Sequence, residues 1–215
     1  ILSSQTDRRD WPELTQSVHR KLSTKLADGR ELIYFDDEGS TIPETRKSDT
    51  REATQRPAVA QMRLDSLTGD WISVAAARQS RAFLPPAHEC PLCPTTSTFA
   101  SEIPDNFDVA VFENKNPAFG PVLLDNDDAS YTLAPSLPLG KELDSVGRCE
   151  VVVFSPKHEG SMSSQSLERV GTILDALTDR TEHLLFRILP RAQGGLGDVG
   201  GPQGFLLAGA GGVGE

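Results

Sequence analysis

The tetrapeptide Cys90-Pro91-Leu92-Cys93 has a counterpart further along the chain in Ser155-Pro156-Lys157-His158. Two thiols separated by two residues can bind one metal ion, and a distant histidine can supply a third ligand. Structural zinc takes four such ligands from cysteine and histidine side chains. The sequence offers Cys90, Cys93 and His158 as candidates and no convincing fourth. We therefore expect a zinc site that joins two distant loops.

Two other interpretations of the cysteine pair are open. A thioredoxin-like redox pair should begin a helix within a βαβ unit, whereas the residues after Cys93 are poor helix formers. The thiols could also be inert and buried. His88, two residues before Cys90, competes with His158 as a metal ligand. Cys149 begins an apolar run and is interpreted as a small core residue.

The overall composition narrows the class of protein. The chain has 215 residues, of which 37% are hydrophobic and 24% charged, which is typical of a soluble globular protein. A formal net charge of −10 argues against nucleic acid and anionic membranes as partners. Three cysteines make a poor disulfide framework and favour a cytoplasmic location. No apolar run is long enough to span a membrane, and the N-terminus does not read as a signal peptide.

The chain divides into three parts by composition. Residues 1–60 read as a polar N-terminal extension with one hairpin, followed by a charged linker or surface loop over Asp36–Pro57. Residues 61–185 read as the globular domain. Residues 186–215 are glycine-rich, and Arg191–Glu215 alone contains ten of the eighteen glycines. Because glycine loses the most backbone entropy on ordering, we expect this tail to be disordered or aberrant.

Short apolar runs predict the secondary structure of the first two parts. Leucine, isoleucine and valine recur at a spacing near 3.6 between Ser163 and Leu184, which predicts one helix with Ser164 or Ser166 as its cap. Residues 121–145 read as a long loop or irregular edge. The expected strands are Glu31–Phe35, Trp71–Val74, Asp108–Phe112 and Glu150–Phe154.

Two further clusters could bind a nucleotide. Arg78 and Arg81 follow the strand Trp71–Val74 and could converge on one phosphate, although the spacing alone is more typical of solvated surface arginines. Asn114 and Lys115 follow another strand, where an amide could contact a ribose hydroxyl or a base edge. A plain turn is the alternative, because asparagine and proline form turns.

Taken together and in order, these motifs resemble the N-terminal half of the galactose-1-phosphate uridylyltransferases over about residues 20–184. The resemblance implies that Cys90, Cys93 and His158 are ligands of a structural zinc ion. It implies phosphate contacts for Arg78 and Arg81 and a uridine contact for Asn114. At the next position, where the family often has an acidic residue or an arginine, this chain has Lys115. The motifs that carry it are Leu67–Val74, Arg78-x-x-Arg81, Cys90–Cys93, Val111–Asn114 and Gly147–His158.

The resemblance also implies a fold and a reaction. The fold would be α+β and histidine-triad-like, a mostly antiparallel sheet with helices on one side, incomplete at the C-terminus. The enzymes are nucleotidyltransferases of galactose metabolism and are typically homodimers. A histidine attacks the α-phosphorus of UDP-glucose, glucose 1-phosphate leaves, and galactose 1-phosphate then accepts the uridylyl group.

The family's nucleophile lies in a His-Pro-His-Gly-Gln motif, and these 215 residues contain no such motif. The first histidine of that motif is also the family's fourth zinc ligand. We therefore expect weak binding of UDP-sugars and no turnover. We hypothesise that the sequence after Leu184 is a frame-shifted or aberrant continuation. Alternatives are a non-catalytic zinc- or nucleotide-binding module, a fragment of a related transferase acting on ADP-sugars, and a fragment that does not fold.

Overall fold

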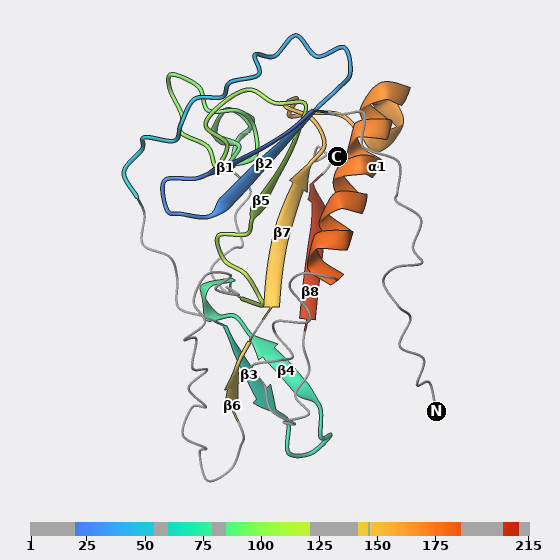
Figure 1. Ribbon diagram of the computed structural model, residues 1–215. Helices are drawn as coiled ribbons and strands as arrows, with labels where there is room; N and C mark the ends of the chain where they lie inside the picture. Colours follow the sequence, from blue (N-terminus) through green and yellow to red (C-terminus); the bar gives the residue numbers. More distant parts are fainter. Residues whose placement is uncertain are drawn as a thin grey trace.

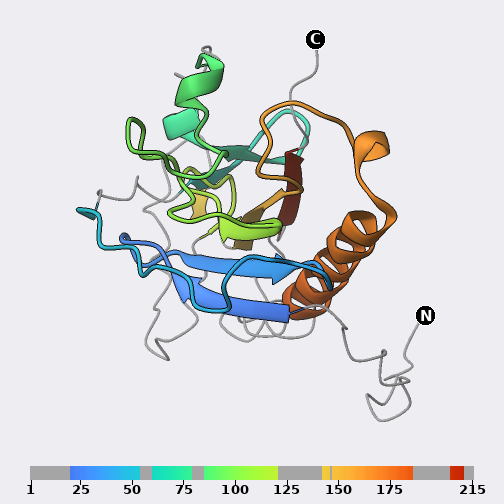
Figure 2. The same cartoon turned by 90° about the horizontal axis from the view of Figure 1, so that it is seen from above.

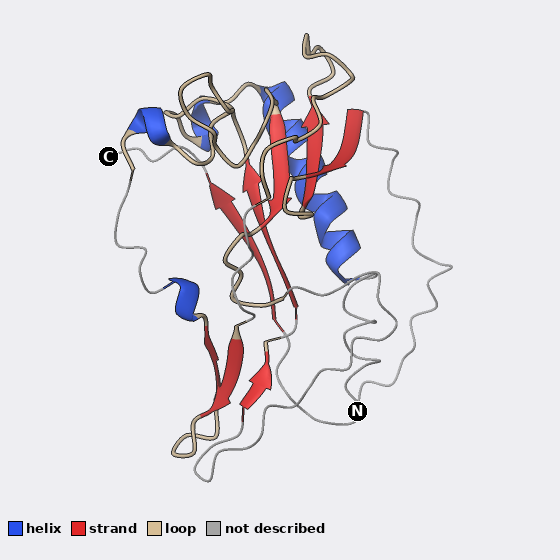
Figure 3. Ribbon diagram, turned by 90° about the vertical axis from the view of Figure 1, so that its left-hand side faces the viewer, coloured by secondary structure: helices blue, strands red, loops and turns tan. Residues whose placement is uncertain are grey.

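Two β-sheets and one long α-helix form the part of the chain that the computed structural model describes, which is residues 20–53, 60–78, 85–120, 142–145, 147–185 and 204–210 (Figure 1). The larger sheet runs in the order β1 (Arg20–Lys25), β2 (Glu31–Asp36), β5 (Val109–Glu113), β7 (Gly147–Val153) and β8 (Gly204–Ala210). The smaller sheet has the order β4 (Trp71–Val74), β3 (Gln61–Leu64) and β6 (Glu142–Asp144), and extends from one end of the larger one (Figure 3).

The fold class is α+β, as the sequence predicts. All strand pairs are antiparallel except β7 with β8. The α-helix α1 spans Leu167–His183, and three short 3-10 helices are η2 (Ala76–Arg78), η3 (Ala87–Glu89) and η4 (Met162–Ser164). None of the helices in the described ranges is long and apolar enough to cross a membrane.

The larger sheet buries apolar side chains on both faces. Successive residues of a strand point to opposite faces, so each central strand contributes to both. Ile33, Val111 and Val152 face α1 and pack with Ile173 of that helix. Seen from above, α1 lies on one side of the sheet and the loops of residues 85–107 on the other (Figure 2). The side chains facing these loops form a second core, made of Leu26, Leu32, Tyr34, Ile103, Phe107, Ala110, Phe112 and Val153.

The helix begins at Leu167, four residues after the start of the predicted range. Ser166 is its cap, and its Oγ accepts a hydrogen bond of 3.1 Å from the Arg169 main-chain N–H. Ile173 is fully buried, but Leu167 is 92% and Leu174 57% exposed. The apolar stripe in the sequence is therefore wider than the face that packs on the sheet.

Part of the glycine-rich tail is a strand, although no strand was expected there. β8 pairs in parallel with β7, in a register that aligns Gly147 with Gly204 and Val153 with Ala210. Strands of parallel pairs commonly read as short apolar runs without alternation, and Phe205–Ala208 is such a run. β3 was also not predicted, and β6 lies in the region expected to be loop; each has only three or four residues.

Candidate metal centre and neighbouring pocket

Cys90, Cys93 and His158 come together although 65 residues separate the second cysteine from the histidine. Their sulfur and imidazole nitrogen atoms all lie within 4.8 Å of one another, and the Cys93 Sγ is 3.7 Å from the His158 Nδ1. Sulfur and nitrogen ligands of a tetrahedral zinc ion are about 3.6 Å apart, given ordinary bond lengths. The donor types and their spacing therefore fit zinc.

The cysteine loop is fixed to the core independently of any metal. Its start follows η3, and the Cys90 main-chain N–H donates to the Ala87 carbonyl at 3.3 Å. Further along, the Glu102 N–H donates to the Pro91 carbonyl at 2.9 Å, and Pro94 forms a β-bridge with the fully buried Ile103. The two thiols are thus held on a loop that is attached to the sheet.

The surroundings favour a neutral Cys93 thiol when no metal is bound. Burial first, and then the hydrogen bond and charge of Cys90, raise the pKa of Cys93 to about 11. Zinc binds thiolates, so loading the site would release protons. A small cavity of about 50 Å³ adjoins the three side chains, and among its other lining residues are Ser155, Glu159, Gly160 and Gln165.

The competing interpretations of single residues can now be compared with the structure. His88 is 79% exposed, and its Nε2 lies 3.7 Å from the Glu89 carboxylate and outside the metal-ligand group. Within the described ranges, Cys90, Cys93 and His158 are the only group that could hold a metal ion. Cys149 is buried in β7, as a core residue would be.

The structure describes three of the four predicted nucleotide-binding residues. Arg78 ends η2 and is exposed, while Arg81 lies outside the described residues. Asn114 forms a turn: its Oδ1 accepts from the Asn116 N–H at 3.0 Å. Lys115 lines a larger pocket, with its Nζ 3.9 Å from a Glu102 carboxylate oxygen.

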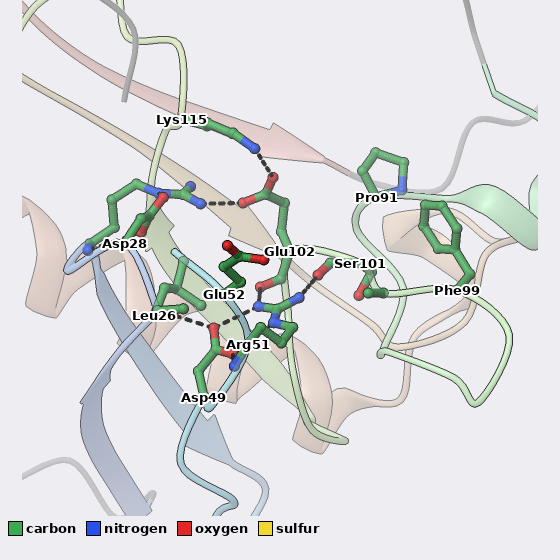
Figure 4. Close-up of a pocket in the computed structure, with 13 residues that line it drawn as sticks. Leu26, Asp28, Asp49, Arg51, Glu52, Pro91, Phe99, Ser101, Glu102 and Lys115 are labelled. Atoms are coloured by element: carbon green, nitrogen blue, oxygen red, sulfur yellow. Dashed lines mark hydrogen bonds and ion pairs between the residues drawn. The ribbon is translucent and has the colours of Figure 1, made fainter. Parts of the chain in front are cut away.

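This larger pocket, of about 400 Å³, was not visible in the sequence (Figure 4). It lies between the β1–β2 turn, residues 49–52, residues 99–102 and Lys115. Most of its charged side chains form ion pairs with one another. The buried Arg30 guanidinium pairs with Asp28 at 2.7 Å and with Glu102, and its Nη1 donates to the Glu113 carbonyl at 2.9 Å.

Residues 37–53, within the stretch Asp36–Pro57 that was predicted to be a linker or surface loop, form a loop that buried ion pairs attach to the rest of the chain. The side chains of Asp36, Arg46 and Asp49 are each no more than 2% exposed. Arg51 pairs with Asp49 at 2.7 Å and donates to the carbonyls of Ser101 and Glu102. The composition of this segment predicts charged side chains in solvent, but Arg51 instead attaches the segment to the loop that carries the cysteines.

Acid should loosen this attachment. Hydrogen bonds from Arg51, opposed by burial, hold the pKa of Asp49 at about 2, against an ordinary value of 3.8. Because the folded pKa is the lower one, the stabilisation is present above pH 3.8 and is lost as the pH falls toward 2. The linkage is worth about 2 kcal/mol. We expect urea unfolding at pH values on either side of this window to show a smaller acid-induced loss for Asp49→Asn than for the wild type; equal losses would contradict the assignment.

Comparison with known protein families identifies the family of this chain. The family model described as galactose-1-phosphate uridyl transferase, N-terminal domain, matches residues 49–190. The chain belongs to this family. The β1–β2 hairpin lies before the matched range.

Three curated relatives carry the name galactose-1-phosphate uridylyltransferase. The protein from Streptomyces lividans is 36% identical over 165 residues, which is 77% of this chain and 39% of that protein. The Thermotoga maritima protein is 32% identical over 58% of this chain and 36% of its own length. The Kluyveromyces lactis protein is 30% identical over 54% of this chain and 35% of its own length. The chain thus spans less than two fifths of each relative. A solved structure titled "Structure of uridylyltransferase" aligns over 57% of this chain and 34% of its own at 24% identity and a TM-score of 0.41, too low a likeness to bear on the fold.

Proposed function

We propose that this chain supplies the zinc-binding and part of the nucleotide-binding region of a cytoplasmic hexose-1-phosphate uridylyltransferase. The observation that carries the proposal is the meeting of Cys90, Cys93 and His158 in a chain of this family. The names of the curated relatives support UDP-glucose and galactose 1-phosphate as the substrates of the whole enzyme.

Zinc would have a structural role in this proposal. Held by the two thiolates and one imidazole, the ion would cross-link the cysteine loop to the segment after β7. Both connect to the larger sheet, so the cross-link would fix loops at the same end of that sheet. All three proposed ligands are partly buried.

Transfer of the uridylyl group needs a nucleophile as well as these loops. A histidine nitrogen would form a bond to the α-phosphorus of UDP-glucose while the bond to glucose 1-phosphate breaks. The phosphate oxygen of galactose 1-phosphate would then displace the histidine. The 215 residues contain no His-x-His motif, so we propose that this chain binds nucleotide without performing the transfer. Arg78, Arg81, Asn114 and Lys115 are the proposed nucleotide contacts.

Calorimetric titration of the zinc-loaded chain tests this function. We expect UDP-glucose to bind weakly, ADP-glucose to bind more weakly still, and Lys115→Ala to reduce UDP-glucose affinity by about tenfold, the typical worth of one charge-assisted hydrogen bond. Lys47→Ala is the matched control, because this lysine is exposed and does not line the pocket. Preference for ADP-glucose would favour the ADP-sugar alternative. Exchange of label between glucose 1-phosphate and UDP-glucose by the pure chain would refute the absence of transfer.

A further inference from the structure

We propose that Gly160 and the adjoining serine box, Ser161–Ser164, position His158 as a metal ligand and thereby set how tightly the chain binds zinc. The proposal rests on the zinc site proposed above and goes beyond it, because neither the glycine nor the serines belong to the metal-ligand group. The cysteine loop is fixed by its own contacts to Ile103 and Glu102, so the third ligand depends on the shape of the loop after β7.

The loop that carries His158 is attached at both ends. At its start, the Ser155 Oγ accepts a hydrogen bond of 3.1 Å from the Lys157 N–H, which turns the chain just before the histidine. Beyond its end, Arg169 in the first turn of α1 reaches back, and its Nη1 donates to the Phe154 carbonyl at 3.4 Å and to the Asp108 carbonyl at 2.8 Å. The histidine therefore sits on a closed loop between strand and helix.

The serine box fixes the second half of this loop. The Ser161 main-chain N–H donates to the Ser164 Oγ at 3.0 Å, and the same hydroxyl donates to the Ser161 carbonyl at 2.8 Å. The Ser164 hydroxyl is therefore engaged both as acceptor and as donor. The Gln165 side-chain amide adds a third bond of 3.2 Å to the Ser161 carbonyl. Moving this hydroxyl would break two hydrogen bonds at once.

Gly160 lies between the histidine and this box, and two properties of the position require glycine. Its φ is +134°, a backbone conformation that residues with a side chain rarely adopt. A Cβ atom there would also lie 3.1 Å from the Ser164 Oγ and 3.7 Å from the Gln165 Nε2. Because the strained φ and the tight contact with this hydroxyl act together, we expect an added methyl group to displace the loop. The displacement would reach His158, which lies two residues before Gly160.

Zinc affinity of the full 215-residue chain, measured by competition with a chromogenic chelator, tests the proposal. Gly160→Ala should bind zinc about 10- to 100-fold more weakly than the wild type, the usual cost of disturbing the groups that orient a ligand. Gly69→Ala is the matched control. Gly69 also has a positive φ, +76°, but it lies in the β3–β4 turn with open space around it. Its substitution should leave zinc affinity unchanged.

Cobalt absorption supplies a readout that a loss of stability alone would not change. We expect the cobalt spectrum of Gly160→Ala to shift toward that of His158→Ala, whereas Gly69→Ala keeps the wild-type spectrum. Should Gly160→Ala fail to fold, Ser164→Ala keeps the glycine, removes the box and should still weaken zinc binding. Wild-type affinity and spectrum in the folded Gly160→Ala chain, or in Ser164→Ala, would overturn the positioning role alone. A wild-type chain that binds neither zinc nor cobalt would overturn the metal centre as well.

Discussion

Cys93→Ser should abolish the stabilisation that zinc gives the wild-type chain. A ligand that binds only the folded state stabilises it by RT ln(1 + [L]/Kd), which is about 4 kcal/mol when free zinc is a thousand times Kd. The serine variant loses one of the three ligands that meet within 4.8 Å, and a site of two protein ligands cannot hold zinc tightly. The measurement is urea unfolding of each chain with zinc and with excess chelator.

Cys149→Ala is the control for this experiment. Cys149 is also a free thiol and is 1% exposed in β7, but it is not part of the metal-ligand group. Its truncation should lower stability by about 1 kcal/mol through lost packing, by the same amount with and without zinc. If chelator destabilises Cys93→Ser as much as the wild type, the three side chains do not form the zinc site.

The three metal-ligand candidates were predictable because each carries a local signal. The spacing of Cys90 and Cys93 brings two sulfurs to one turn, and His158 stands four residues after Phe154, the end of an apolar run that reads as a buried strand. That these side chains meet is a property of the sheet. β7 pairs with β5, and β5 is preceded by the loop of the cysteines. Their binding of zinc stays a prediction.

The central strands and the helix were predictable for a similar reason. Val109–Val111 and Val151–Val153 are continuous apolar runs, and the helix has a 3.6-residue period. β3 and β6 lack such signals, and the apolar run of β8 is short and lies among glycines. Their assignment depends on partners far along the chain, as the pairing of β3 with both β4 and β6 shows. A histidine-triad-like topology stays a prediction.

The larger pocket could not be predicted because its walls are charged. Asp49 and Arg51 belong to a stretch with almost no apolar residues, and composition assigns such a stretch to solvent. Only the fold reveals that the Asp49 carboxylate is buried and that Arg51 donates to the cysteine loop. Arg148 and Glu150 are charged as well, and the sequence did not predict that their side chains are buried in β7.

A buried charge network joins that strand to the helix. The Glu150 carboxylate accepts two hydrogen bonds of 2.8 Å from Arg180 and one of 3.0 Å from Arg148. Glu150 and Arg180 are each 1% exposed, and Arg148 is 4% exposed. Burial alone would raise the pKa of Glu150, but the hydrogen bonds and charges of the two arginines outweigh it and hold the pKa below its usual value. The carboxylate is therefore ionised and pairs with two buried cations.

Glu150→Ala should accordingly destabilise the fold by about 3–5 kcal/mol, the range found when one partner of a buried ion pair is removed. Arg180 would keep only Glu31 and Asp179, at 3.7 and 3.5 Å. Urea unfolding at neutral pH measures the loss, and Glu182→Ala, at an exposed position of the same helix, should change stability by less than about 0.5 kcal/mol. The double variant Glu150→Leu with Arg180→Leu should recover much of the loss, because it removes the stranded charge together with its partner. A double variant less stable than Glu150→Ala would mean that the guanidinium of Arg180 stabilises the helix through contacts other than this carboxylate.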